Sequence, residues 1–223
     1  MVDIIIYIKG GVLPHDNIAA QTIDNSTQLR ESFYMLFSQL IDDVYWFNII
    51  LGAGYKNTVN FFKSAHSVNN KFLLIDLEKP KSQKSEKLKE LDLENLNTVF
   101  FMVQEMEAWI LSQPEKIDEY YSLKYKRKKL GDSIKNDKRL QSKHPEEICK
   151  PSSVLNIILK KYFSVEKRGK IKKKTYGKLK DAPELLSLLD AKVLKETFSD
   201  LSELINLINL YQLALPKSKD LTP

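Results

Sequence analysis

Four short apolar runs, separated by segments with helical spacing, constrain the fold of this 223-residue chain more than any other feature. The runs cover residues 4–8, 45–51, 72–75 and 99–103. Between the first two runs, apolar residues recur at helical spacing, at Leu29, Phe33, Leu36, Phe37 and Leu40. Strands that alternate with helices are typical of βαβ units. The pattern predicts an α/β fold, with a mainly parallel sheet flanked by helices.

The second half of the chain has a different pattern. We expect helices over residues 115–121, 152–162, 182–189 and 191–213. Residues 124–150 show little periodicity and predict a long basic loop. Residues 167–178 form a second lysine-rich segment between two expected helices, for which a solvated loop is one of two open interpretations. The domain interpretation is an α/β core over residues 1–123, followed by a basic loop and helical C-terminal extension over residues 124–223 that packs on the core.

Acidic and basic residues are segregated along the chain. Residues 1–120 hold 11 Lys or Arg against 17 Asp or Glu, whereas residues 121–180 hold 20 against 5. A basic half could hold an anionic polymer while the acidic half supplies carboxylates for a metal ion. The alternative is that the lysines form a solvated surface that keeps the protein soluble.

Several classes of protein are disfavoured. The apolar runs are shorter than the roughly 20 residues of a membrane span, and the N-terminus does not resemble a signal peptide. One cysteine excludes an internal disulfide and fits a cytoplasmic protein. The three histidines have no zinc spacing, and no Gly-x-Ser-x-Gly elbow of a serine hydrolase accompanies them.

Carboxylates follow the last two predicted strands. Asp76 and Glu78 end the third run and would share one face of a strand, because side chains alternate. Glu107 follows the fourth run, and the carboxyl ends of parallel strands meet at one edge of a sheet. These three acids predict a site for Mg²⁺ or Mn²⁺. In the alternative interpretation Asp76 caps a turn and Glu78 is solvated. Glu105 lies on another face of the same predicted helix as Glu107 and is expected to be an ordinary exposed acid.

Two glycine turns and one basic segment complete the candidate features. Gly10-Gly11 and Gly52-Ala53-Gly54 follow strands, where glycine allows a tight turn or a close approach to phosphate, but neither matches a nucleotide-binding fingerprint. The basic segment combines cations with an aromatic ring and suits contact with a nucleic-acid backbone. Its candidate residues are Lys172, Lys173, Lys174, Tyr176 and Lys178.

At these positions the chain resembles a bacterial family of uncharacterised Toprim-like proteins. Such proteins are related in fold to the catalytic domain of topoisomerases, primases and overcoming-lysogenization-defect nucleases. The resemblance covers most of the chain in the right order, and the Met-Glu-Ala-Trp block is its most specific part. The matching segments are Tyr7-Ile8-Lys9-Gly10-Gly11, Gly52-Ala53-Gly54, Ile75-Asp76-Leu77-Glu78, Met102-Val103-Gln104-Glu105-Met106-Glu107-Ala108-Trp109, Glu147-Ile148-Cys149-Lys150-Pro151 and Tyr176-Gly177-Lys178.

The resemblance implies a Toprim-like sheet whose metal site uses a glutamate after the first strand and acids after the third. It also implies action beside an ATPase partner in bacterial antiphage defence. This chain departs from the pattern, because Lys9 stands where the family has that glutamate. An ammonium group cannot ligate magnesium, so Lys9 would instead contact a phosphate or pair with Asp76.

Our leading hypothesis from the sequence is a magnesium-dependent nuclease subunit of an antiphage defence, abortive-infection or toxin system. Asp76, Glu78 and Glu107 would hold metal, Lys9 would contact the scissile phosphate, and the basic segment would position DNA or RNA. One rival is a non-catalytic Toprim-like module that binds or regulates an ATPase partner or nucleic acid. A second rival is a toxin-like component that binds nucleic acid through its basic half alone.

Overall fold

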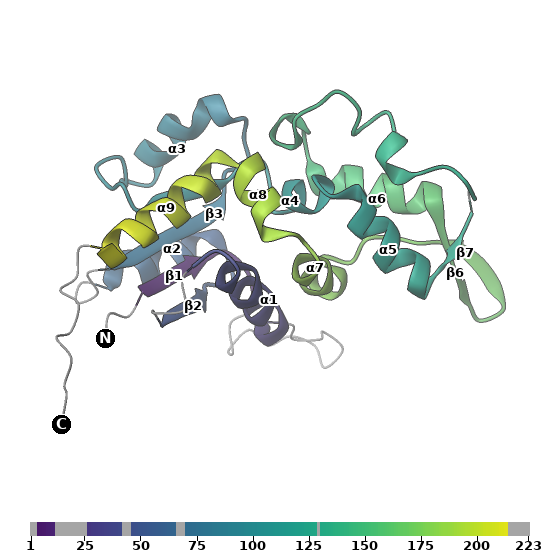
Figure 1. Cartoon of the computed structure of the whole chain (residues 1–223), viewed down its shortest axis with the longest axis horizontal. Helices are drawn as coiled ribbons and strands as arrows, with labels where there is room; N and C mark the ends of the chain where they lie inside the picture. The colour runs from purple at the N-terminus through teal and green to yellow at the C-terminus, as the bar shows by residue number, and fades with distance from the viewer. Residues whose placement is uncertain (1–3, 12–25, 42–45, 66–69, 129, 214–223) are drawn as a thin grey trace.

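A four-stranded parallel sheet forms the centre of the first half of the chain in the computed structural model (Figure 1). The structure describes residues 4–11, 26–41, 46–65, 70–128 and 130–213. The sheet has the order β2-β1-β3-β4, and every pairing in it is parallel. Its strands are β1 (Ile4–Ile8), β2 (Phe47–Leu51), β3 (Lys71–Asp76) and β4 (Val99–Met102). The predicted α/β fold is confirmed, and it is consistent with a Toprim-like fold.

Helices cover both faces of this sheet, which explains why its strands read as continuous apolar runs. On one face, Ile6 and Ile8 of β1 pack with Phe33 of α1 (Ser26–Ser38), and Tyr211 of α9 (Ser199–Leu213) contacts Phe72 of β3. On the other face, Tyr7 packs edge to face on Phe62 of α2 (Tyr55–Ser64). Helix α3 (Lys84–Glu90) lies on that second face as well.

The second half of the chain forms a helical body with a small antiparallel sheet at its far end (Figure 1). Its helices are α4 (Glu107–Leu111), α5 (Pro114–Lys124), α6 (Pro151–Tyr162), α7 (Lys178–Ser187) and α8 (Ala191–Thr197). Its sheet has the order β5-β6-β7, from β5 (Lys126–Arg127), β6 (Phe163–Lys167) and β7 (Lys170–Lys173). Single 3₁₀ turns occur at Lys81–Gln83, Ile134–Asn136 and Pro145–Glu147.

Two local predictions differ from this structure. The helix expected over residues 191–213 is two helices, because Phe198 is extended between them and buries its ring. Residues 167–178, for which a solvated loop is one open interpretation of the sequence, form the end of a hairpin, a short connection and the start of α7. Lysine-rich strands that bury little apolar surface have no alternating pattern, so this hairpin could not be recognised from hydropathy.

The C-terminal helices return to the parallel sheet. Oδ2 of Asp200, in the first turn of α9, accepts hydrogen bonds from the Phe101 backbone N–H at 2.9 Å and from Lys84 Nζ at 2.7 Å. The division of the chain at residues 123 and 124 stays a prediction. Within the described residues no helix has both the length and the apolar character needed to cross a membrane.

Candidate functional site

Charged side chains gather at the carboxyl edge of the parallel sheet. Ile8 pairs with Leu74 and Asp76 pairs with Met102, so β1, β3 and β4 end at neighbouring positions. Lys9 follows β1 directly and Asp76 is the last residue of β3. The geometry of parallel strands thus brings these two side chains together, as the sequence predicts.

Lys9 pairs with two acids, Asp76 at the end of β3 and Glu78 in the turn that follows. Its Nζ lies 3.0 Å from Oδ2 of Asp76 and 2.5 Å from Oε1 of Glu78. The Asp76 side chain is 4% exposed, that of Lys9 is 23% exposed and that of Glu78 is 56% exposed. Lys9 therefore bridges a buried and an exposed carboxylate.

Glu107 lies in a second, adjacent group. Its carboxylate is fully buried at the start of α4. Oε1 accepts a hydrogen bond from the Tyr176 hydroxyl at 3.2 Å and lies 3.1 Å from Lys178 Nζ, which also donates to Oε2 at 3.2 Å. Tyr176 and Lys178 come from the segment that precedes and begins α7, nearly 70 residues further along the chain.

The backbone after β3 and β4 fixes these positions. The Met106 N–H donates to Oδ1 of Asp76 at 2.9 Å, and the Glu78 N–H donates to the Gln104 carbonyl at 2.7 Å. Glu78 and Gln104 both have positive φ, 58° and 63°. Non-glycine residues rarely take this conformation, which costs about 1 kcal/mol or more. The two turns are held by their contacts with each other and with Asp76.

The net effect of burial and neighbouring charged groups is to raise the pKa values of Lys9 and Glu107 and to lower that of Glu78. Burial lowers the pKa of Lys9, but Asp76 and Glu78 outweigh it and the net pKa is raised. The hydrogen bond from Lys9 lowers the pKa of Glu78. Burial raises the pKa of Glu107, Lys178 opposes that shift, and the charge of Asp76 adds to it. Asp76 and Glu107 are therefore close enough to repel each other when both are ionised.

Tyr176 and Lys178 hold their protons beside Glu107. Burial raises the pKa of the Tyr176 phenol, and the Glu107 charge raises it further. For Lys178, burial lowers the pKa, but the charges of Glu107 and Asp76 raise it by more. Both groups thus remain hydrogen-bond donors to Glu107 across the physiological pH range.

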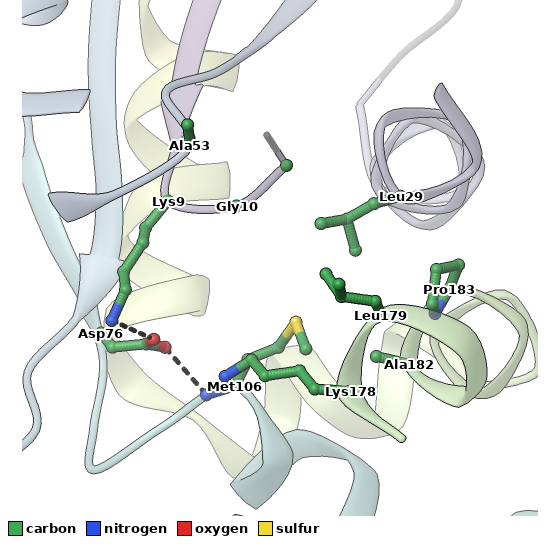
Figure 2. A pocket seen from close by; sticks show the side chains of 11 residues that line it. Lys9, Gly10, Leu29, Ala53, Asp76, Met106, Lys178, Leu179, Ala182 and Pro183 are labelled. Atoms are coloured by element: carbon green, nitrogen blue, oxygen red, sulfur yellow. Dashed lines mark hydrogen bonds and ion pairs between the residues drawn. The ribbon is translucent and has the colours of Figure 1, made fainter. Parts of the chain in front are cut away.

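A pocket of about 150 Å³ opens beside Lys9 and Asp76. Gly10, Gly11 and Ala53 from the two glycine turns line one side of it. Figure 2 shows Leu29 of α1 and Leu179 of α7 pointing toward one another across from Lys9. Sequence reasoning did not identify this apolar wall, because it arises from the packing of α7 on α1, which no local pattern indicates.

The carboxylates of Asp76, Glu78 and Glu107 are the groups that would hold Mg²⁺ or Mn²⁺. Their chemistry suits these ions, which prefer oxygen ligands. Their arrangement does not, because both oxygens of Asp76 and both of Glu107 already accept hydrogen bonds or pair with ammonium groups. Within the described ranges, no three His, Cys, Asp or Glu side chains are grouped so as to hold a metal. As they lie here, the residues do not fit a divalent cation.

The structure divides the predicted basic segment into separate parts. Lys172 and Lys173 are exposed on β7. Lys174 is buried, and its Nζ lies 2.8 Å from Oδ2 of Asp181. The side chains of Tyr176 and Lys178 both donate hydrogen bonds to the Glu107 carboxylate. Only Lys172 and Lys173 of this set therefore present free cations to a nucleic-acid backbone, and their role stays a prediction.

Together, fold and site define an α/β protein with acids and lysines gathered at the carboxyl edge of a parallel sheet. Residues 21–209 match the family described as domain of unknown function DUF4276, and the chain belongs to that family. No curated protein and no solved structure matches the chain.

Proposed function

We propose that this protein is a non-catalytic Toprim-like subunit that binds nucleic acid in a bacterial antiphage defence or toxin system. The observation that carries the proposal is the pairing of Lys9 with Asp76 and Glu78. A lysine at the end of the first strand supplies the positive charge that a metal would bring, without the ability to activate water. The carboxyl edge then becomes a self-paired structural cluster.

The charge balance of the cluster supports the same proposal. Among the described residues, the ion pairs of Asp76, Glu78 and Glu107 are with Lys9 and Lys178, so these five groups carry one negative charge in excess when all are ionised. An excess of negative charge repels a phosphate group. Nucleic acid would therefore bind through the basic second half of the chain, where 20 Lys or Arg face 5 Asp or Glu over residues 121–180.

An ATPase is the protein partner that we propose, from the Toprim-like resemblance alone. In this arrangement the ATPase supplies the energy-dependent step, and this chain supplies contact with nucleic acid. The partner proposal is tested by co-purification with an ATPase encoded beside this chain. A complex that forms in the absence of nucleic acid supports it, and two proteins that elute separately under all nucleotide conditions contradict it.

A metal-dependent nuclease is the second candidate, and one specific observation favours it. The charge of Asp76 contributes to the raised pKa of Glu107, so two buried carboxylates share this edge with a net negative charge. A divalent cation would relieve that repulsion if Lys9 moved away. This candidate requires a rearrangement of the Lys9 side chain, which is 23% exposed.

One set of measurements separates the two candidates. The purified full chain and its Asp76→Asn form are incubated with DNA and RNA in Mg²⁺ or Mn²⁺, and nucleic-acid binding is measured in parallel. The proposal expects binding by both proteins and cleavage by neither. Metal-dependent cleavage that disappears in Asp76→Asn would establish the nuclease instead, and failure of the wild-type chain to bind any nucleic acid would contradict both.

Manganese binding gives an independent test. The wild-type chain is expected to bind Mn²⁺ weakly in electron paramagnetic resonance titrations, because Lys9 holds two of the acids. Lys9→Glu replaces the ammonium with a fourth carboxylate and is expected to tighten Mn²⁺ binding at least tenfold. Lys89→Glu makes the same charge change at an exposed position and serves as the control. Tight binding by the wild-type chain would contradict the non-catalytic assignment.

A further inference from the structure

The strands β6 and β7 form a two-stranded hairpin that extends beyond the helical body (Figure 1). Lys167 lies opposite Lys170 in the antiparallel register, and the turn between them consists of Arg168 and Gly169. Both turn residues have positive φ, 55° and 70°, as a two-residue type I′ turn requires. Every residue from 166 to 173 is exposed. The hairpin thus presents a narrow ribbon with both faces open to solvent.

The hairpin carries a concentrated positive charge. Its five cations are accompanied by a single acid, Glu166. No acidic side chain in the described part of the chain lies within salt-bridge distance of any of the five, whereas Lys9, Lys84 and Lys178 are all paired. The five cations are Lys167, Arg168, Lys170, Lys172 and Lys173. Their charge is available to an external anion.

The base of the hairpin is anchored in the helical body. Phe163 is fully buried, and its carbonyl accepts a hydrogen bond from the Lys174 N–H at 3.1 Å. Lys174 is anchored in turn by its buried ion pair with Asp181. The exposed lysines are therefore displayed on an element whose position is fixed, rather than on a loose tail.

Edge protection alone does not account for this charge. Lysines on an exposed edge strand such as β7 hinder pairing with another sheet, and this explains Lys170 and Lys172. Among the described residues β5 pairs only with Phe163 and Ser164, so the outer edge of β6 is also free at Lys167, and edge protection explains that lysine too. It does not explain Arg168, which lies in the turn at the tip. The positive charge therefore covers the tip of the hairpin as well as both of its free edges.

We propose that this hairpin binds double-stranded DNA by lying in the major groove, with its cations on the flanking phosphates. A two-stranded ribbon fits the major groove of B-form DNA, which is about 12 Å wide. The major groove of A-form RNA is deep and narrow and does not admit it. Single strands are usually held by stacking on aromatic rings, and positions 166–173 contain none. The inference rests on the proposed function and names its substrate class.

The side chains of the ribbon also indicate how specific the binding is. Lysines neutralise phosphates without distinguishing bases, and the one large apolar side chain on β7, Ile171, is 72% exposed. We therefore expect binding that depends strongly on salt and weakly on sequence. Such a hairpin would hold any duplex DNA for the other parts of a complex.

The test compares two triple variants of the full chain that lose equal charge. Lys170→Gln, Lys172→Gln and Lys173→Gln remove cations from the hairpin, whereas the control carries Lys56→Gln, Lys89→Gln and Lys192→Gln at exposed positions elsewhere. Fluorescence anisotropy measures affinity for a DNA duplex, an RNA duplex of the same sequence and a single strand. The hairpin variant should bind duplex DNA at least tenfold more weakly, and the control less than twofold.

Salt dependence and chemical footprinting complete the test. The slope of log K against log salt should fall by about 2 to 3 in the hairpin variant, since each phosphate contact contributes about 0.9. The bound wild-type chain should protect guanine N7, which faces the major groove, from methylation. Equal losses in both variants, a preference for RNA or single strands, or unprotected N7 would overturn the inference.

These outcomes separate the inference from the proposed function. Nucleic-acid binding that survives the hairpin substitutions overturns the hairpin assignment and leaves the non-catalytic function standing. Loss of duplex DNA binding in the hairpin variant, together with metal-dependent cleavage that requires Asp76, supports the hairpin and overturns the non-catalytic function. Circular dichroism melting of each triple variant confirms that the compared proteins are folded.

Discussion

The ammonium group of Lys174 lies 2.8 Å from Oδ2 of Asp181, and the two side chains are only 10% and 0% exposed. Lys174 also donates to the Thr175 carbonyl at 2.8 Å and lies over the rings of Tyr121 and Tyr125. Asp181 accepts a second hydrogen bond, from the Gly177 N–H at 2.9 Å. This pair joins the end of the basic hairpin to the start of α7, whose residues reach Glu107.

Removal of the Lys174 charge should therefore destabilise the protein, whereas removal of the charge of its neighbour Lys173 should not. Lys174→Met keeps the apolar stem but leaves Asp181 buried without a cation, and we expect a loss of about 3 kcal/mol in the free energy of unfolding. Lys173→Met, at an exposed position, should change it by less than about 0.5 kcal/mol. Urea denaturation measures both. Equal stability of the two variants would contradict a structural role for the pair.

Glu107→Gln should change the dependence of stability on pH. Burial raises the pKa of Glu107 in the folded protein above its value in the unfolded chain. Protonation of Glu107 therefore stabilises the folded protein at a pH below the unfolded pKa. This stabilisation is lost as the pH rises through the folded pKa. Glutamine keeps hydrogen-bonding groups and does not titrate. The variant should therefore gain stability relative to wild type between pH 4 and pH 8, by on the order of 1 kcal/mol.

The control for this prediction is Glu196→Gln, at an exposed position in α8. This exposed variant should stay within about 0.5 kcal/mol of the wild-type stability. Urea denaturation at both pH values gives the four differences required. A Glu107→Gln variant that loses stability relative to wild type as the pH rises would show that the carboxylate is stabilised as an anion, against the direction given by its burial.

The strands and the acidic edge were predictable because they depend on local patterns and one rule of topology. The apolar runs of β1, β3 and β4 are almost continuously buried, whereas the edge strand β2 exposes Asn48. Parallel strands also place Asp76 beside Lys9 at one edge of the sheet. The role of Tyr176 and Lys178 was not predictable. Their approach to Glu107 depends on the packing of α7 against α4, which involves residues about 70 positions apart in the chain. Charge content alone could not separate these residues from the exposed lysines before them.

Asp200 should be necessary for the attachment of α9 to the sheet. Strand β4 is an edge strand, and Asp200 covers its outward N–H at Phe101 while it pairs with Lys84. Asp200→Ala leaves a buried donor without a partner, and we expect a loss of about 2 to 3 kcal/mol. Hydrogen exchange of the Phe101 amide should accelerate in the same variant. Glu203→Ala, exposed on the same helix, should leave both measurements unchanged.

Gly52 and Gly54 flank the same turn but should respond very differently to alanine. A Cβ at Gly52 would lie 2.4 Å from Oγ1 and 2.5 Å from Cα of Thr58, so the backbone of α2 would have to move. A Cβ at Gly54 has no heavy atom within 4 Å. We expect Gly52→Ala to lose about 1 to 3 kcal/mol in urea denaturation and Gly54→Ala to lose less than about 0.5 kcal/mol. Because Thr58 is fully buried and donates to the Gly54 carbonyl at 2.8 Å, it cannot turn away from the added methyl group without losing that bond. If Gly52→Ala were as stable as Gly54→Ala, the close approach of the turn to α2 would not be a constraint. The glycine at position 52 would then have to be explained by the pocket that Ala53 lines.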